Sequence, residues 1–400
     1  MKDVVIVDAC RTAVGKFGGT LKPVNADFLA EAVIKGVLDR SGLAADKVDE
    51  VIMGHCRQTS DFSNTARVAA LRAGIPESVP CNTVMCACAS GMLAVNNAVN
   101  SIMVGQNEIV IAGGTESMTN GFFYLSNARW GVGTGSASLK DCLTEAQFNS
   151  QPKEIYGSFN MGMTAENVAE RFGISREEQD AFALASQEKA FAAIRSGRFK
   201  DEIVPLTIFQ GKKKPPIVFD TDEFPRETNL EALAKLKPAF KDGGCVTAGN
   251  ASGRNDGASA VLLMSADKAA ELGLKPLARI RGVAAAGVDP KIMGMGPVAA
   301  TQKVMKSTGL KLSDIDLIEL NEAFASQSVA CIHELGLDDR MDIINVNGGA
   351  IALGHPIGSS GCRILVTLVH EMIKRKAKLG LATLCIAGGM GMATVVELLD

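Results

Sequence analysis

The first residues in the chain that could do covalent chemistry are three cysteines in one short stretch, Cys81, Cys86 and Cys88. Residues 81–95 begin like a buried strand, pass through small residues and open an apolar-periodic helix. Backbone N–H groups at such a helix N-terminus are unpaired and stabilise a thiolate. Because small residues follow Cys88, we predict that Cys88 is the nucleophile. Two alternatives are ordinary core cysteines and a metal or redox site, but the spacing is not that of a zinc knuckle and we expect no metal.

An activated thiol needs a base, and histidine is the side chain best suited to that role at neutral pH. Of the four histidines, His355 stands before a proline in a glycine-rich loop that leads into a helix. The glycines permit close approach by a ligand or by backbone, and the proline fixes the chain. His55 and His333 have no comparable context, and we expect His370 on the exposed face of a helix. We therefore predict that His355 is the partner of Cys88.

Two further polar residues lie at predicted strand ends. Cys385 closes a buried strand and precedes a glycine-rich turn, and Asn321 follows a strand and precedes a helix. Taken alone, Cys385 would be a core residue and Asn321 a helix N-cap. In an α/β sheet, however, ligands bind at the carboxyl ends of the strands. Because Cys88, Asn321, His355 and Cys385 all lie near such ends, we predict that they form one site.

Alternating strands and helices must position these residues, which indicates βαβ units and a mostly parallel, buried sheet. In the first half the pattern predicts strands at residues 4–8, 48–54, 79–85 and 108–112, with helices at 27–40, 64–73 and 90–104. After a long interruption, strands are predicted at 258–264, 278–285, 315–320, 343–346, 382–387 and 394–398, with helices at 296–308, 322–335 and 359–375.

The second half repeats the first, because each reads β-α-β-α-β-α-β-β. The fourth strand of each half ends in a matching segment, Ile109-Val-Ile-Ala-Gly-Gly114 and Leu384-Cys-Ile-Ala-Gly-Gly389. We therefore predict two similar α/β domains in a layered arrangement whose third helices pack together, so that loops from both halves meet. The expected division is an N-terminal domain of residues 1–116 and 256–272, a loop subdomain of 117–255 and a C-terminal domain of 273–400.

The loop subdomain loses the strand–helix rhythm. Helices are predicted at 163–172 and 176–196, the second with a capping box from Ser175 to Glu178, and loops are predicted at 212–216 and 220–226. An insertion of this length with its own helices is typical of a segment that covers a substrate.

The composition excludes several classes of protein. The 400 residues are 47% hydrophobic and 21% charged with a net charge of −3, which argues against a nucleic-acid-binding surface. No apolar run approaches the roughly 20 residues that span a membrane. We recognise no secretory, transit or peroxisomal signal, and ten cysteines without such a signal are expected to be reduced thiols. We therefore expect a soluble cytoplasmic protein.

These motifs, in this order, resemble the thiolases, a family of acyl-CoA C-acyltransferases, along essentially the full chain. The matching segments are residues 11–19, 88–91, 113–118, 161–167, 248–253, 321–324, 354–361 and 385–389. Asn321-Glu-Ala-Phe324, Gly354-His-Pro and the segment that begins at Cys385 are highly specific when they occur together.

The resemblance implies a thiolase-like fold and a reversible Claisen condensation of acetyl-CoA with an acyl-CoA. Cys88 would carry the acyl group, His355 would take its proton, and Cys385 would remove a proton from Cα of acetyl-CoA. One oxyanion would bind His355 and a water held by Asn321, and the other would bind the backbone N–H groups of Cys88 and Ala387. CoA and acyl-CoA would be the substrates, with no further cofactor. The remaining implied contacts are Ser252 with pantetheine, Arg226 near the adenosine, and Met161, Met293 and Phe324 around the acyl group.

The chain departs from the family pattern at several positions. Met85 and Ala89 stand where the family usually has Asn and Gly, and Ala387 stands where Gly is usual. Asn160 replaces a His of the short-chain members, and Ala13 replaces a Pro. Because a backbone N–H survives at Ala387, the second oxyanion site can survive too. We expect substrate choice to differ from the family mainly around residues 81–95.

Three alternatives remain beside a thiolase. A decarboxylating ketoacyl synthase of the same fold would need a second histidine where Cys385 stands. A non-catalytic or partner-dependent acyl-CoA-binding protein is opposed by the intact Cys88, His355 and Cys385. A metal or redox protein would have to use the three clustered cysteines. Thiolase-like chains assemble as homodimers or homotetramers, so we expect one of these states.

Overall fold

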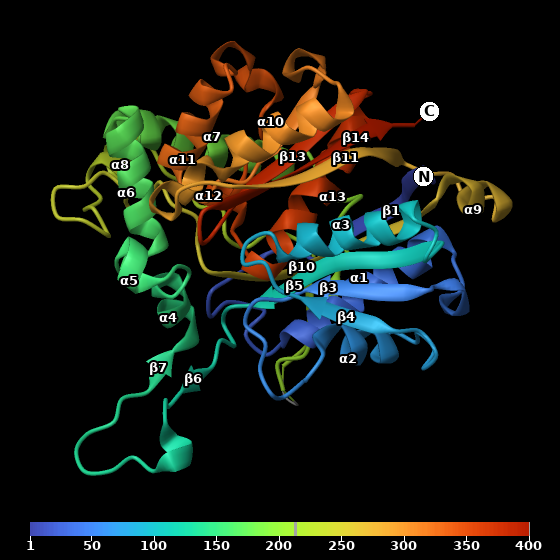
Figure 1. The fold of residues 1–400 in the computed structure, drawn as a ribbon, viewed down its shortest axis with the longest axis horizontal. Helices are drawn as coiled ribbons and strands as arrows, with labels where there is room; N and C mark the ends of the chain where they lie inside the picture. The colour runs from blue at the N-terminus through green and yellow to red at the C-terminus, as the bar shows by residue number, and fades with distance from the viewer. Residues whose placement is uncertain (212–213, 400) are drawn as a thin grey trace.

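In the computed structural model, which describes residues 1–211 and 214–399, two α/β halves are stacked with helices between them (Figure 1). The predicted layered α/β class is therefore confirmed. Lys212 and Lys213, at the start of the predicted loop 212–216, and Asp400 lie outside the described residues.

The N-terminal half builds a sheet in the order β4-β3-β5-β10-β1. β3 runs parallel to β4 and β5, whereas β10 runs antiparallel to β5 and β1. The strands are β1 (Val4–Arg11), β3 (Glu50–Gly54), β4 (Cys81–Val84), β5 (Ile109–Ser117) and β10 (Asn255–Ser265), with β2 (Gly15–Lys16) beside β10. The helices are α1 (Ala26–Ser41), α2 (Thr65–Arg72), α3 (Ser90–Met103) and, after β10, α9 (Ala266–Glu271).

The C-terminal half continues the path in the order β11-β14-β13-β12. Its strands are β11 (Ala278–Gly287), β12 (Leu317–Leu320), β13 (Leu379–Ile386) and β14 (Met390–Leu398). Its helices are α10 (Gly296–Thr308), α11 (Ala325–Glu334), α12 (Ala350–Leu353) and α13 (Ile357–Arg375). β1 and β11 join the halves through a short antiparallel pairing at Val5 and Ile6.

Three sequence predictions about strands were wrong. The sheet is not mostly parallel: among the described strands β3–β4, β3–β5 and β12–β13 pair in parallel, whereas the other pairings of this sheet are antiparallel. The strand predicted at 343–346 is reduced to one bridge between Ile344 and Ile318. The reason is Asn345, whose φ of 43° turns the chain and whose side-chain amide pairs with the backbone N–H and C=O of Leu320. The strand predicted to end before Gly113 and Gly114 instead continues as β5 to Ser117.

The third helices of the two halves, α3 and α13, pack against each other between the sheets, as predicted (Figure 1). Glycines allow this close packing. A Cβ on Gly91 would lie 3.0 Å from the carbonyl O of Gly358, and one on Gly361 would lie 2.7 Å from the Cβ of Met92. The apolar core around both helices is fully buried, so the relative position of their N-termini is rigidly set.

The insertion between β5 and β10 has its own elements, and the capping box predicted at Ser175 and Glu178 is present. These elements are β6 (Phe123–Tyr124), β7 (Lys140–Asp141), α4 (Cys142–Phe148), α5 (Lys153–Tyr156), α6 (Met161–Phe172), α7 (Arg176–Arg195), β8 (Leu206–Ile208), β9 (Ile217–Phe219) and α8 (Leu230–Ala234). Residues 121–141, which we name the arm, project away from the body, with the β6–β7 pair at the base of the projection (Figure 1).

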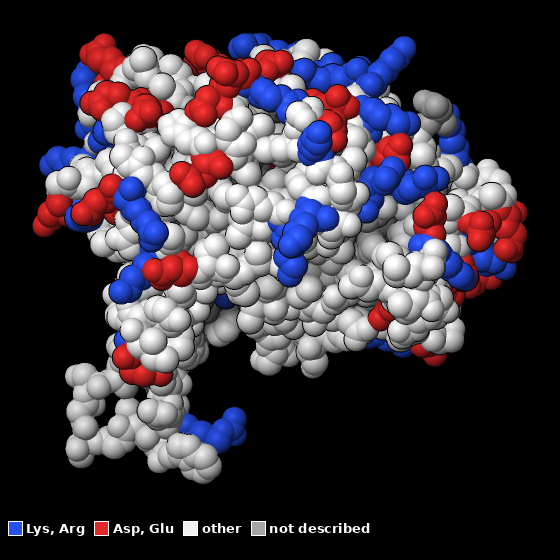
Figure 2. All heavy atoms as spheres, turned by 45° about the horizontal axis from the view of Figure 1, so that its top comes forward, with Lys and Arg blue, Asp and Glu red and all other residues white. Residues whose placement is uncertain are grey.

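Charged side chains of both signs are interspersed over the upper part of the face in Figure 2, whereas the arm at the lower left carries few. Within residues 1–211 and 214–399, the helices lack the combination of length and apolar character that crossing a bilayer requires.

Candidate active site

Cys88 lies on a tight turn between β4 and α3, as predicted. Ala87 adopts a φ of 43°, a left-handed conformation that non-glycine residues rarely adopt. The Ser90 hydroxyl fastens this turn, because it donates to the carbonyl of Ala87 at 2.7 Å and accepts from the N–H of Cys86 at 2.8 Å. Strained backbone held by surrounding bonds is common at functional sites, where it fixes a reactive side chain in place.

A cavity of about 660 Å³ opens beside this turn and is walled by both halves and the insertion. Its size suits a small-molecule substrate. Most of the residues predicted from the sequence line it: Cys88, His355, Ala387, Ser252, Met161, Met293 and Phe324. The structure thus brings together the predicted nucleophile, the predicted base and the predicted backbone donor in one cavity.

His355 is held in an orientation that suits a base. Its Nδ1 lies 2.6 Å from the Ser360 hydroxyl oxygen, and that hydroxyl also lies 2.9 Å from the carbonyl of Pro356. A carbonyl can only accept, so the single hydroxyl proton goes to Pro356 and Nδ1 must carry its own proton. The Nε2 lone pair is then free, and this buried atom has no hydrogen-bond partner among the described residues.

Burial sets the ionisation of the pair. Burial and the nearby positive charge of Arg363 lower the pKa of His355 to about 4, so the imidazole is neutral at physiological pH. Burial raises the pKa of Cys88 to about 11, although the N–H of Ala387, the charge of Arg57 and its own N–H pull it down. The resting pair is therefore thiol and neutral imidazole.

The backbone N–H groups of Ala387 and of Cys88 itself lie near the Cys88 sulfur and lower the pKa of this thiol. Two donors therefore converge where negative charge would develop on an attacked carbonyl. Ala387 follows β13 and precedes Gly388 and Gly389, whose φ values of 91° and 84° form the turn into β14. This turn needs glycine at the last two positions, and its geometry does not depend on the side chain at 387.

Cys385 and Asn321 lie behind the cavity wall. Both are fully buried. Burial raises the pKa of Cys385 well above 9.0, and negative charge on Cys88 raises it further, so the two thiols are electrostatically coupled. Neither the Oδ1 nor the Nδ2 of Asn321 has a partner within the described parts of the chain. The helix that follows begins at Ala325, so Asn321 is not its N-cap.

Arg226 lies apart from the cavity lining. Its guanidinium donates to the carbonyl of Ala248 and stands 5.6 Å above the Phe224 ring. It is exposed beside the 248–253 segment, which also carries Ser252. The structure therefore does not bring Arg226 to the thiols, and its predicted place at the far end of CoA needs no such contact.

Four further residues support the site and were missed in the sequence. Glu116, at the end of β5, accepts from the N–H groups of Cys56, Arg57 and Gly358 at 2.9–3.1 Å. Although burial alone would raise the pKa of Glu116, the neighbouring His55 lowers it. His55 is buried against this carboxylate, with Nε2 3.4 Å from Oε1. This contact ties the loop after β3 to the start of α13.

Arg57 and Ser360 also escaped detection, because an isolated Arg or Ser carries no signal in a single sequence. The alternation of small residues after His355 could have suggested Ser360 as its support. The prediction that His370 is exposed was wrong, because it is buried with Nε2 2.8 Å from the carbonyl of Ala9. Its helix, α13, is covered on every side by the two sheets, so no face of its middle is a surface.

Four of the positions that depart from the family pattern differ in their burial and local contacts. Met85 is 61% exposed and lines the cavity mouth, whereas Ala89 is buried as the N-cap of α3. Asn160 caps α6, with its Oδ1 accepting from the N–H of Met163 at 2.9 Å. Ala13 is buried in the core. Of these, Met85 alone is placed by the described residues on the cavity lining.

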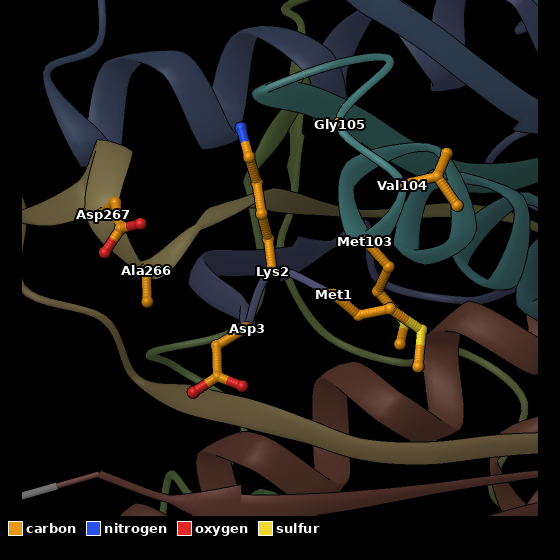
Figure 3. A pocket seen from close by; sticks show the side chains of 8 residues that line it. All are labelled: Met1, Lys2, Asp3, Met103, Val104, Gly105, Ala266 and Asp267. Carbon is orange, nitrogen blue, oxygen red and sulfur yellow. The ribbon is translucent and has the colours of Figure 1, made fainter.

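A second hollow, of about 630 Å³, lies where the start of β1 meets the ends of α3 and β10 (Figure 3). Its described lining contains neither cysteine nor histidine, and the Lys2 ammonium is paired with Glu108. Figure 3 shows Lys2 pointing away from Asp3 and Asp267. No reactive constellation comparable to Cys88 and His355 is formed there by the described residues.

Comparisons with known proteins agree with the fold and the site. The family model for the thiolase N-terminal domain matches residues 4–267, and that for the thiolase C-terminal domain matches residues 274–398. The chain therefore belongs to the thiolase family.

Relatives and solved structures of this family match over the whole chain. An acetyl-CoA acetyltransferase of Syntrophomonas wolfei is 53% identical, with 100% of both chains covered, and one of Pseudomonas aeruginosa is 54% identical, with 98% of each covered. The crystal structure of the Bacillus anthracis acetyl-CoA acetyltransferase has a TM-score of 0.96 at 47% identity and covers 100% of this chain and 99% of its own. That of human mitochondrial 3-ketoacyl-CoA thiolase in complex with CoA has a TM-score of 0.94 at 42% identity, with 100% and 98% covered.

Proposed function

We propose that this thiolase, an acyl-CoA C-acyltransferase, transfers acyl groups through a thioester on Cys88. The observation that supports this most directly is the meeting of the Cys88 thiol, the free Nε2 of His355 and the N–H of Ala387 at one cavity. The relatives named acetyl-CoA acetyltransferase and 3-ketoacyl-CoA thiolase support the same reaction.

In the first step Cys88 attacks the thioester carbonyl of an acyl-CoA, and His355 takes the thiol proton. With pKa values of about 11 for the thiol and about 4 for the imidazole, a stable thiolate–imidazolium pair is unfavourable. Proton transfer is therefore coupled to carbon–sulfur bond formation. CoA leaves with the proton, and the N–H groups of Cys88 and Ala387 stabilise the oxyanion.

In the second step the Cys385 thiol gives its proton to His355, the Cys385 thiolate removes a proton from Cα of acetyl-CoA, and the carbanion attacks the acyl group on Cys88. A carbon–carbon bond forms, the Cys88 thiolate leaves and recovers a proton from His355, and 3-ketoacyl-CoA is released. His355 and a water held by the Asn321 amide stabilise the enolate oxygen. Burial raises the pKa of Cys385, so its thiolate is a strong base once it forms. The reverse sequence cleaves 3-ketoacyl-CoA.

Substrate contacts follow the cavity outward. Met161, Met293 and Phe324 surround the acyl group, Ser252 lies along the pantetheine, and Arg226 lies near the adenosine. The binding of CoA by a relative of 42% identity, the human mitochondrial 3-ketoacyl-CoA thiolase, supports these contacts. The reaction as written requires no cofactor beyond the CoA substrates, and neither a nucleic acid nor a membrane is a partner in it.

The three predicted segments divide this work. Residues 1–116 with 256–272 carry the nucleophile, 273–400 carry His355 and Cys385, and 117–255 cover CoA. A non-catalytic acyl-CoA-binding protein would not need the two coupled thiols, and no feature of the described site favours it over the enzyme.

Thiolysis of 3-ketoacyl-CoAs tests the proposal. Purified protein is mixed with CoA and a panel of 3-ketoacyl-CoAs, and loss of the enolate absorbance is followed. Cleavage of at least one substrate is expected, and cleavage of none would rule the function out. Cys88→Ser should abolish acyl-enzyme formation, whereas Cys385→Ser should still trap an acyl group on Cys88. Mass-spectrometric detection of the label on Cys385 instead would reverse the two roles.

We also propose that the chain is a cytoplasmic homodimer or homotetramer. The arm supports a homo-oligomer, because Phe123, Trp130 and Leu139 are 64%, 86% and 68% exposed. Between residues 121 and 139 the sequence has a single charged side chain, Arg129. Large exposed apolar side chains on a projection with so few charges indicate a surface that contacts another protein chain. Light scattering during size exclusion should show an oligomer, and replacing the arm by a short Gly-Ser link should lower its mass.

A further inference from the structure

Arg57 places a positive charge in the cavity beside the nucleophile. It follows β3, and its N–H donates to Glu116 Oε1 at 3.1 Å, which fixes its backbone. Its half-buried side chain lines the same cavity as Cys88 and acts electrostatically on that thiol. The apolar side chains of Met118, Leu143 and Ile357 also line this cavity.

The Arg57 guanidinium makes no hydrogen bond or ion pair with the described residues, although Arg57 and the Glu116 carboxylate interact electrostatically. Its Nε is buried without a hydrogen-bond acceptor within residues 1–211 and 214–399. Glu116 is the nearby acid, but its carboxylate is occupied by His55 and by three backbone N–H groups, and the ion pairs of the described residues do not include Arg57. Arg11 shows the contrast, because its buried guanidinium contacts Glu202 at 2.6 Å and Asp222 at 2.7 Å.

A partly buried cation without a counter-charge is unfavourable unless a ligand supplies one. The described lining of the cavity holds two arginines, Arg57 and Arg254, and no Asp or Glu. Arg254 is partly neutralised by Asp141, at 3.8 Å from its carboxylate. Arg57 is therefore the cavity arginine without a direct ion pair among the described residues, and it lines the same cavity as Cys88.

We propose that Arg57 selects acyl groups that end in a carboxylate, so that the preferred substrates are short 3-ketoacyl-CoAs with a terminal carboxylate. The inference rests on the proposed function and specifies its substrate class. The guanidinium and the carboxylate form a charge-assisted pair in a partly apolar cavity, where such a pair is strong and geometrically selective. An alkyl chain of the same length leaves the cation unpaired.

The chemistry is that of the proposed thiolysis, with nothing further consumed. Cys88 attacks the 3-keto carbon, the bond between C2 and C3 breaks, and acetyl-CoA leaves with a proton on its former C2. The dicarboxylic acid remains as a thioester on Cys88, with its free carboxylate on Arg57. CoA then displaces Cys88 and releases the dicarboxylic acid as its mono-CoA thioester.

The test compares kcat/KM for 3-oxoadipyl-CoA with that for 3-oxohexanoyl-CoA, which share a carbon skeleton and differ at the terminal carboxylate. We expect the wild-type protein to favour 3-oxoadipyl-CoA by about 100-fold, since truncating one partner of a buried charge pair has effects of this size. Arg57→Leu should abolish or invert the ratio, and Arg57→Lys should restore part of it. The ratio is the readout because loss of the charge beside Cys88 can slow both substrates together.

Arg254→Leu is the matched control. This variant removes the other cavity arginine. Because Asp141 already partly neutralises Arg254, we expect the ratio of the two kcat/KM values to stay unchanged. A wild-type ratio near or below one, or an Arg57→Leu variant that keeps the preference, would overturn the inference while thiolysis itself stands. Failure to cleave either substrate, with failure across the wider panel, would instead remove the proposed function.

Discussion

Replacing Ser360 by Ala tests the assignment of His355 as the base with its proton on Nδ1. The hydroxyl of Ser360 is the acceptor that fixes this tautomer at 2.6 Å. In Ser360→Ala the Nδ1–H loses its acceptor at a position that is buried, with His355 only 5% exposed. The ring can then rotate, and the alternative tautomer, with its proton on Nε2, is no longer disfavoured.

The size of the effect follows from the lost bond. A buried donor left without an acceptor costs about 1–3 kcal/mol. The bond matters more in the transition state, because the ring becomes an imidazolium as Nε2 takes the Cys88 proton and a charged donor bonds more strongly. A loss of about 2 kcal/mol of transition-state stabilisation corresponds to a decrease of about 30-fold in kcat/KM for acylation.

The assay is single-turnover acylation of Cys88, followed by mass spectrometry, for Ser360→Ala and for its neighbour Ser359→Ala. Ser359 is an informative control because it is buried on the same helix but pairs with Ser259, at 2.9 Å, and not with His355. The reasoning is refuted if Ser360→Ala acylates at the wild-type rate, or if Ser359→Ala loses as much activity as Ser360→Ala.

Two further predictions concern pH and packing. Because burial lowers the pKa of His355 to about 4, the acid limb of acylation should have its midpoint near that value, and a midpoint near the ordinary 6.5 in a pH–rate profile would contradict the assignment. Between pH 6.5 and about pH 4, His355 is protonated in the unfolded chain but neutral in the folded chain. The free energy of unfolding measured with urea should therefore fall as the pH decreases through this range. Gly114→Ala should destabilise the protein by about 2–3 kcal/mol and lower kcat, because its Cβ would lie 2.0 Å from the Gly358 carbonyl at the start of α13. Gly287→Ala, whose nearest atom is 3.9 Å away, should be tolerated, and equal thermal shifts for the two variants would contradict this account.

The sequence predicts best where a local pattern determines the structure. The turn at Cys88 was found because a strand, small residues and a helix follow one another, and the loop of His355 was found because its glycines and proline precede a helix. Both residues stand two positions before the first residue of their helices, α3 and α13. The symmetry of the two halves then placed them at the same region of the molecule.

The sequence predicts poorly where a contact is made between distant segments. The strand expected around Asn345 was lost because one side-chain amide took the hydrogen bonds that a strand would have used. The similar Gly-Gly segments differ because Gly113 packs against β10, whereas Gly388 forms a turn. Arg57 shows the same limit, since the feature that distinguishes it is the lack of a direct ion pair within the described structure, which only three-dimensional proximity reveals.

The packing of α3 against α13 also has a consequence for redesign of the protein. The spacing between Cys88 and His355 is set by glycine contacts such as Gly91 with Gly358, which lie outside the cavity. Helix α4 of the insertion contributes Leu143, Ala146 and Gln147 to the cavity lining. The glycine contacts that position the reactive pair and the α4 part of the cavity wall are therefore encoded in separate stretches of the gene. Exchanging the stretch for α4 among relatives would alter that part of the wall without disturbing the reactive pair, so the shape of the cavity can change by segment exchange rather than by rebuilding the catalyst.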